Sequence, residues 1–190
     1  SVRLASSLAY VFWHWPRGGV SPEAYEAKLA SFQRILSSSR VPGLLEALSF
    51  RVGSLPWVPA DGPAYEDWYV VKDFSALDAL NEGAVTGNAR NPHDLIAKDY
   101  LKGAGGVLKL ISGNVSLRDA LSATWIEKPI GPSYQSYYDD VAGVVGEKES
   151  SLWRRQLVLG PSPQFCVHSE DPIEFPQSFR PVVSTLRLIQ

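Results

Sequence analysis

The side chains best suited to proton transfer stand at the ends of two aromatic, β-branched segments. His14 closes the run 8–15 (LAYVFWHW), and Glu127 lies near the end of the run 123–128 (ATWIEK). An imidazole titrates near neutral pH, and a carboxylate beside it can orient the ring or carry the proton itself. We therefore take His14 and Glu127 as candidate catalytic residues. The alternative is that both are ordinary polar residues at exposed strand ends.

Strand alternation indicates which side chains would surround these groups. In the first segment Tyr10 and Phe12 share a face with His14, and Trp13 lies on the opposite face. Aromatic side chains commonly line pockets for organic molecules, although each of them can equally belong to a well-filled core. The candidate substrate-binding residues are Tyr10, Phe12, Trp13, Trp125 and His168.

Other reactive residues suggest less chemistry. His168 follows Cys166 at the spacing that puts both on one strand face, but a buried core cysteine is the usual outcome. His93 lies in the first turn of a predicted helix and would be the axial ligand if haem bound there. With one cysteine and no metal-ligand spacing, the sequence predicts no metal site. The glycine-rich run 103–106 precedes a predicted strand, so it is no phosphate loop.

Composition narrows the classes of partner. The net charge is −2, and the Lys and Arg residues are spread along the chain, which argues against nucleic acid and membrane partners. The apolar runs are too short to cross a bilayer. We expect a cytoplasmic protein, although the absence of Met leaves room for a removed leader.

Predicted elements occur twice in the same order. The first copy reads as a strand at 8–15, a helix capped by Ser21, strands at 48–52 and 67–72, helices from Ser75 and from Asn91, and a strand at 107–111. The second reads as a strand at 123–128, a helix capped by Ser133, and strands at 155–159, 165–168 and 185–189. In place of the second helical stretch it has 170–181, whose two prolines predict an irregular loop with Ile173, Phe175 and Phe179 against the sheet.

Three sets of residues support this repeat. Pro16, Gly18 and Tyr25 recur as Pro129, Gly131 and Tyr138, all shifted by 113 residues, which makes Glu127 the counterpart of His14. Gly53 and Pro56 recur as Gly160 and Pro163 at a shift of 107, and 107–111 (VLKLI) matches 185–189 (TLRLI). A repeated βαββαβ unit predicts two four-stranded antiparallel sheets with helices on one face of each.

The element order and the repeat resemble the dimeric α/β-barrel superfamily of ferredoxin-like proteins, which includes EthD-like proteins, small antibiotic-biosynthesis monooxygenases and muconolactone isomerase. No catalytic motif of one family carries the resemblance, which covers nearly the whole chain. It implies an α+β fold in which tandem repeats, 8–112 and 122–190, close a pseudo-dimeric barrel within one chain. It also implies a pocket between sheet and helices for an aromatic compound, often without a metal, while some relatives bind haem.

These expectations combine into one functional hypothesis. The chain would be a cofactor-independent enzyme that acts by proton transfer on a hydrophobic or aromatic small molecule, as an isomerase, cyclase, lyase or oxygenase. His14 would border an enclosed pocket, and His14→Ala would abolish activity and leave the fold intact. The alternatives are a non-catalytic carrier with the same pocket and a haem protein. A homodimer of the fused chain is a further expectation.

Overall fold

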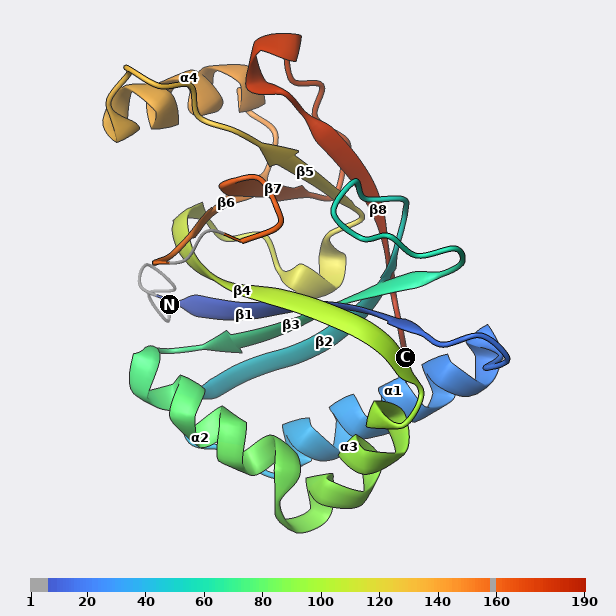
Figure 1. The fold of residues 1–190 in the computed structure, drawn as a ribbon. Helices are drawn as coiled ribbons and strands as arrows, with labels where there is room; N and C mark the ends of the chain where they lie inside the picture. Colours follow the sequence, from blue (N-terminus) through green and yellow to red (C-terminus); the bar gives the residue numbers. More distant parts are fainter. Residues whose placement is uncertain (1–6, 158–159) are drawn as a thin grey trace.

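Eight strands form one closed barrel in the computed structural model, which describes residues 7–157 and 160–190 (Figure 1). The first half of the chain contains β1 (Leu8–Pro16), α1 (Pro22–Ser38), β2 (Leu44–Val52), β3 (Ala64–Val71), α2 (Phe74–Val85), the 3-10 turn η1 (Gly87–Ala89), α3 (Arg90–Ala97) and β4 (Tyr100–Gly113). The second half contains η2 (Leu117–Asp119), β5 (Ser122–Ile126), α4 (Tyr134–Val145), β6 (Ser150–Arg155), β7 (Phe165–Ser169), η3 (Gln177–Phe179) and β8 (Val182–Leu188).

The strand order is the same in the two halves. Around the barrel it is β4-β1-β3-β2 and then β8-β5-β7-β6, with every neighbouring pair antiparallel. The halves join edge to edge at two seams, β2 with β8 and β4 with β6. The predicted α+β fold, a tandem ferredoxin-like repeat that closes a pseudo-dimeric barrel within one chain, is confirmed.

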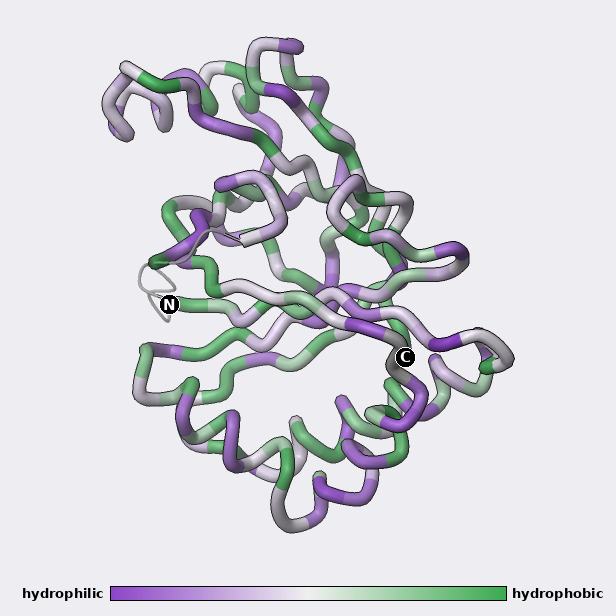
Figure 2. The backbone as a smooth tube through the Cα atoms, in the orientation of Figure 1, coloured by the Kyte–Doolittle hydropathy of each residue, from purple (hydrophilic) through white to green (hydrophobic). Residues whose placement is uncertain are grey.

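Alternation along the strands separates the barrel interior from the faces below the helices. Ala9, Val11, Trp13 and Trp15 of β1 belong to one apolar cluster that takes residues from all eight strands, so this cluster fills the interior. The other face of β1 packs under α1, α2 and α3, which cover the first half, whereas α4 covers the second (Figure 1). Green apolar positions alternate with pale and purple ones along several strands in Figure 2.

The helices begin where local chemistry favours them. Ser21 accepts a hydrogen bond from the Ala24 amide with Pro22 at the first helical position, and Ser133 does the same for Ser136, as predicted. The segment 170–181 is irregular apart from η3, and its apolar side chains pack beside α4, also as predicted.

Several predicted boundaries are wrong. Asp73, not Ser75, caps α2, because the Asp73 carboxylate accepts a hydrogen bond from the Ala76 backbone amide. β4 begins at Tyr100 and not at residue 107, so the glycine-rich run 103–106 lies inside the strand and does not precede it. The strand expected at 155–159 is β6 at Ser150–Arg155, and residues 158 and 159 lie outside the described residues.

The first part of the repeat is shifted by 112 residues rather than 113. The helix caps Ser21 and Ser133 correspond at this shift, and so do Trp13 and Trp125, which both point into the barrel. A slip of one residue exchanges the two faces of a strand, so Glu127 is not the counterpart of His14. The match of 107–111 with 185–189 is confirmed, because β4 and β8 hold these residues in equivalent registers against β1 and β5.

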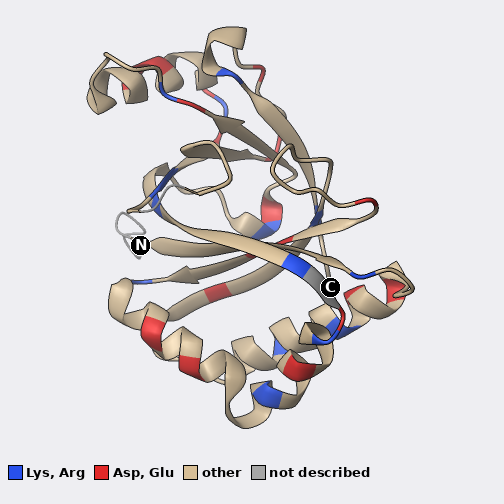
Figure 3. Ribbon diagram, viewed as in Figure 1, with Lys and Arg blue, Asp and Glu red and all other residues tan. Residues whose placement is uncertain are grey.

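Charged residues of both signs are scattered over the two halves (Figure 3). Among the described residues, no helix combines the length and the apolar character that crossing a bilayer would require.

Candidate functional site

A pocket of about 410 Å³ lies between the first-half strands and the three helices that cover them. β1 and β3 supply its aromatic floor, and the helices supply apolar walls with two polar side chains, Asn81 and His93. The lining residues are Tyr10, Phe12, Phe32, Tyr69, Leu77, Leu80, Asn81, Ala84, Val85, His93 and Val107. The size and the mixture of aromatic and aliphatic groups suit a small organic molecule.

Two glycines of β4 make room for the aromatic floor. A Cβ atom at Gly105 would stand 2.8 Å from the Tyr10 hydroxyl and 2.9 Å from the Val11 carbonyl oxygen, and one at Gly103 would overlap the Phe12 ring. The rings of Tyr10 and Phe12 therefore lie across the neighbouring strand, stacked on each other with centroids 6.2 Å apart. Tyr10 also stacks on Tyr69 at 6.2 Å.

A chain of hydrogen bonds leads from the pocket wall into the protein. The Tyr69 hydroxyl donates to Asp67 Oδ2 at 3.0 Å, and Asp67 Oδ1 contacts His14 Nε2 at 2.9 Å. Behind the ring, His14 Nδ1 lies 2.5 Å from the Tyr25 hydroxyl. His14, Asp67 and Tyr25 are fully buried. Tyr69 is thus the pocket end of a chain that continues through Asp67 to His14.

Two further side chains, Ser49 and Gln33, make hydrogen bonds to Asp67 and Tyr69. Ser49 Oγ donates to Asp67 Oδ1 at 2.6 Å, so the buried carboxylate receives hydrogen bonds from more than one side. Gln33 on α1 donates to both the Tyr69 hydroxyl, at 3.0 Å, and Ser49, at 2.8 Å. A buried charge is tolerated when it is hydrogen-bonded in this way.

Tyr10 adds a second phenol to the pocket. Burial and the charge of Asp67 both raise its pKa above the usual value of a tyrosine. The hydroxyl therefore keeps its proton at neutral pH and can donate a hydrogen bond to a developing negative charge on a bound molecule.

The structure separates the residues that the sequence analysis grouped together. Tyr10 and Phe12 line the pocket, whereas His14 lies behind Phe12, with ring centroids 5.2 Å apart, and does not line it. Trp13 and Trp125 meet in the barrel interior at 5.5 Å. The expectation that His14 borders the pocket is wrong, because the Phe12 ring occupies that position.

His168 and Glu127 also lie away from this pocket. His168 packs on Trp68 inside the barrel at 4.5 Å between centroids, and burial lowers its pKa to about 3, so the ring is neutral. Glu127 Oε2 accepts the Gln164 amide at 2.9 Å, and the Glu127 amide donates to the Phe179 carbonyl. Glu127 therefore ties the end of β5 to the two segments beside it.

In the second half, apolar residues stand at the positions that correspond to the hydrogen-bonded residues of the first half. At the shift of 112, Ile126 takes the place of His14 and Val145 that of Gln33. Val167 takes the place of Asp67, because it pairs with Thr124 as Asp67 pairs with Phe12. Leu152 takes the place of Ser49, because it pairs with Val167 as Ser49 pairs with Asp67. These replacements form one apolar cluster under α4. Among the residues that the structure describes, only those of the first half form this series of polar contacts.

The sequence analysis missed Asp67, Tyr69, Ser49 and Gln33. Asp67 and Tyr69 alternate with Glu66 and Trp68 along a strand in which every residue is buried. Two adjacent acids within such a strand are unusual, because a buried carboxylate needs partners. This was the signal available for the site, although it does not identify the partners.

Haem, the alternative raised by the sequence, would need an iron ligand and cations for its two propionates. His93 is the one imidazole among its lining residues, and its Nδ1 lies 3.2 Å from Asp94 Oδ1, an arrangement compatible with an iron ligand. The lining includes no Lys or Arg to balance two propionates. These residues fit a neutral aromatic molecule better than haem.

No family model matches the sequence, and no curated protein matches it. The fold is similar to a “putative monooxygenase” from Lactobacillus acidophilus, with 10% identity, a TM-score of 0.60 and coverage of 97% of this chain and 95% of that one. It is also similar to an anthrone oxidase-like protein, with 9% identity, a TM-score of 0.52 and coverage of 97% of this chain and 92% of that one. A “Putative Chlorite dismutase” is similar as well, with 10% identity, a TM-score of 0.54 and coverage of 97% of this chain and 95% of that one. At these identities the likeness shows the fold alone, a closed barrel of two ferredoxin-like halves in one chain.

Proposed function

We propose that the chain is an enzyme that moves a proton on a hydrophobic, aromatic small molecule bound in the pocket over the first-half sheet. The observation that carries this proposal is the hydrogen-bonded series Tyr69–Asp67–His14, which connects a tyrosine of the pocket lining to a buried carboxylate and an imidazole. A pocket that only held an apolar ligand would need no such chain. No metal or cofactor is part of the proposed reaction.

The proposed step uses the two oxygens at the pocket end. The Tyr69 oxygen takes a proton from a C–H or O–H group of the substrate while the Tyr69 proton passes to Asp67 Oδ2. Asp67 holds the proton until it returns through Tyr69 to another atom of the substrate or leaves. A positioned acid or base of this kind contributes about 10²–10⁴ in rate. An isomerase, cyclase, lyase or oxygenase could all begin with this step.

The other residues would position groups and stabilise charge. His14 acts through Asp67, whose carboxylate it orients, so we assign it a positioning role and not contact with the substrate. The Tyr10 hydroxyl stabilises the enolate or phenolate that forms when the proton leaves. Phe12 and Phe32 supply flat apolar surface. Glu127 has no part in this step.

Proton exchange on anthrone tests the proposal. Anthrone, named in the description of one structural neighbour, has a C–H group acidified by two rings and a carbonyl. Incubated without oxygen in deuterated buffer, it should gain deuterium faster with the protein than without, as measured by mass spectrometry. Tyr69→Phe should lower that rate about 100-fold or more, while equilibrium dialysis shows anthrone binding within threefold of wild type.

Two comparisons interpret the result. Tyr134→Phe removes a phenol from α4 and should leave exchange unchanged. Wild-type protein that binds anthrone without accelerating exchange supports the carrier instead. If Tyr69→Phe exchanges as fast as wild type, the proposed step is wrong.

The haem alternative has its own test, because His93 faces the pocket. Protein mixed with hemin should show no Soret shift that depends on His93. A shifted Soret band that is lost in His93→Ala would favour the haem protein over the enzyme proposed here.

A further inference from the structure

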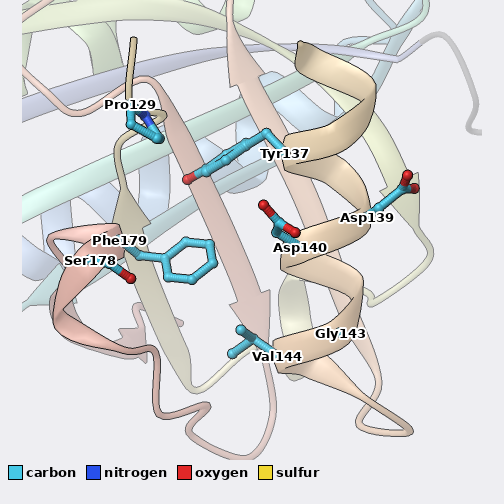
Figure 4. A pocket seen from close by; sticks show the side chains of 8 residues that line it. All are labelled: Pro129, Tyr137, Asp139, Asp140, Gly143, Val144, Ser178 and Phe179. Carbon is cyan, nitrogen blue, oxygen red and sulfur yellow. The ribbon is translucent and has the colours of Figure 1, made fainter. Parts of the chain in front are cut away.

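A second pocket, of about 440 Å³, lies on the other half of the molecule between α4 and η3 (Figure 4). It shares no lining residue with the first pocket. Its walls combine apolar groups with two carboxylates and two hydroxyls, and they consist of Pro129, Tyr137, Asp139, Asp140, Gly143, Val144, Ser178 and Phe179. Nothing in the proposed reaction uses this pocket.

The charged side chains that line this pocket are both acidic. Figure 4 shows the Asp140 carboxylate on the side of α4 that faces Phe179, and the Asp139 carboxylate pointing to the other side. The Asp140 carboxylate makes no hydrogen bond or ion pair with any other residue in the part of the chain that the structure describes, whereas the Asp139 carboxylate accepts a hydrogen bond from Gln135. The nearby Lys128 ammonium donates to the Pro129 carbonyl at 3.0 Å. Asp140 therefore keeps its charge available to a ligand.

The Tyr137 hydroxyl gives a second, independent indication of a ligand. Tyr137 is only 2% exposed, and its hydroxyl has no hydrogen-bond partner among the described residues. Figure 4 draws this side chain across the pocket, and its ring lies 5.8 Å from that of Phe179 between centroids. Burial, and then the charges of Glu127 and Asp140, raise its pKa, so the phenol stays protonated and its oxygen can still accept a hydrogen bond.

We propose that this pocket binds a primary ammonium carried on a short apolar body. The ammonium has three N–H donors, which suits a site where Asp140 supplies a carboxylate and Tyr137 a phenolic oxygen. The apolar body packs against Phe179, Pro129 and Val144. A carboxylate-bearing ligand of the same size is repelled by Asp140 and Asp139.

The probe for this site is 2-phenylethylamine, followed by isothermal titration at low ionic strength. Wild type should bind the amine at least tenfold more tightly than 2-phenylethanol or phenylacetate. Asp140→Asn should weaken the amine at least fivefold, and Tyr137→Phe about twofold to fourfold. Glu147→Gln removes the same charge just beyond the end of α4, outside the lining of this pocket, and should change the affinity less than twofold.

A blocking variant separates the pocket from general charge effects. Gly143 lines the pocket, and a Cβ there meets no atom within 4 Å, so Gly143→Leu starts a bulky side chain from open space at the pocket wall. It should abolish amine binding with the circular dichroism unchanged. Equal binding of amine and alcohol, or an unchanged affinity in both Asp140→Asn and Gly143→Leu, overturns the proposal. The outcome is independent of exchange on anthrone, since the two pockets are lined by different residues.

Discussion

Glu66 and Asp67 are consecutive residues of β3, both fully buried, and they face opposite sides of the sheet. Asp67 faces the helices, where it takes part in the proposed reaction. Glu66 points into the barrel, where Trp13 Nε1 and Trp68 Nε1 donate to its two oxygens, each at 2.7 Å. Burial nevertheless raises the pKa of Glu66 to about 7, more than these hydrogen bonds lower it.

Glu66 and His168 should make opposite contributions to the pH dependence of stability. Glu66 binds its proton more tightly in the folded state, so its contribution to the free energy of unfolding falls as pH rises from its unfolded pKa of 4.5 to about 7. His168, with its pKa lowered from 6.5 to about 3, binds its proton more tightly in the unfolded state, so its contribution rises with pH from about 3 to 6.5. Between pH 4.5 and 6.5 the two slopes cancel.

In Glu66→Gln the pH dependence of the free energy of unfolding that His168 contributes should no longer be cancelled. We expect its free energy of unfolding, relative to that of wild type, to fall on acidification from pH 6.5 to 4.5 by roughly 1 kcal/mol per pH unit, close to the value for one proton. Urea denaturation at several pH values measures this. In Glu66→Gln/His168→Gln the extra slope should disappear. A Glu66→Gln curve parallel to that of wild type would show that the two groups do not titrate as stated.

The glycines of β4 shape the first pocket, because they have no side chains where the rings of Tyr10 and Phe12 lie. Gly105→Ala should bring the new methyl group against the Tyr10 hydroxyl and the Val11 carbonyl, which cannot both move away. We expect a loss of stability of about 1–3 kcal/mol, because overpacking of a close contact costs that much. Weaker anthrone binding should accompany it, because Tyr10 must shift.

The neighbouring glycine provides the control. A Cβ at Gly106 meets no atom within 4 Å, so Gly106→Ala should change stability by less than about 0.5 kcal/mol and leave binding unchanged. Thermal unfolding and equilibrium dialysis compare the two variants. Equal destabilisation by both would mean that loss of glycine in the strand matters, and not the space that the aromatic rings occupy.

The order of the elements could be predicted from the sequence, but not the faces that they present. Strands and helix caps carry local signals, and the alternation in 8–15 and the caps Ser21 and Ser133 were confirmed, whereas Ser75 was not. The shift between the copies was inferred from Pro16, the last residue of β1, and Gly18 in the loop that follows, and a loop tolerates an added residue. An error of one residue in the shift was enough to make Glu127, and not Ile126, the apparent counterpart of His14. The partners of Asp67 come from β1, β2 and β3, and no local pattern reveals such contacts.

The fate of His14 shows the same limit. The sequence analysis placed His14 at the border of an enclosed pocket, where alanine could replace it with the fold intact. In the structure it is buried against Asp67 and Tyr25, so His14→Ala leaves a buried carboxylate short of a partner. We now expect this variant to lose about 3 kcal/mol or more of stability, a loss that thermal unfolding would detect.

At the scale of the whole molecule, both seams of the barrel are made within one chain. β2 pairs with β8 and β4 with β6, so the first pocket is complete without a second copy. Exchange on anthrone per chain should therefore stay constant when the protein is diluted across any dissociation seen by light scattering. The predicted homodimer is compatible with this result, but a loss of activity on dilution would mean that a second copy completes the site.

The two halves also offer an internal comparison of one side chain in two settings. At the shift of 112, Tyr25 of α1 corresponds to Tyr137 of α4, and both are buried. The Tyr25 hydroxyl contacts His14, whereas the position of His14 is taken by Ile126 beneath Tyr137, whose hydroxyl has no partner among the residues described. Loss of a hydroxyl should therefore be costly only in the first half.

Tyr25→Phe should lower the free energy of unfolding by about 1–3 kcal/mol, because the buried His14 ring loses this partner. Tyr137→Phe should leave it unchanged or raise it by up to about 1 kcal/mol, because burying a hydroxyl without a partner is itself unfavourable. Urea denaturation of both variants at pH 7 makes the comparison, with the same chemical change in each. Equal losses would mean that the second half retains a polar partner for Tyr137, and that the apolar cluster under α4 is not the degenerate copy of the site in the first half.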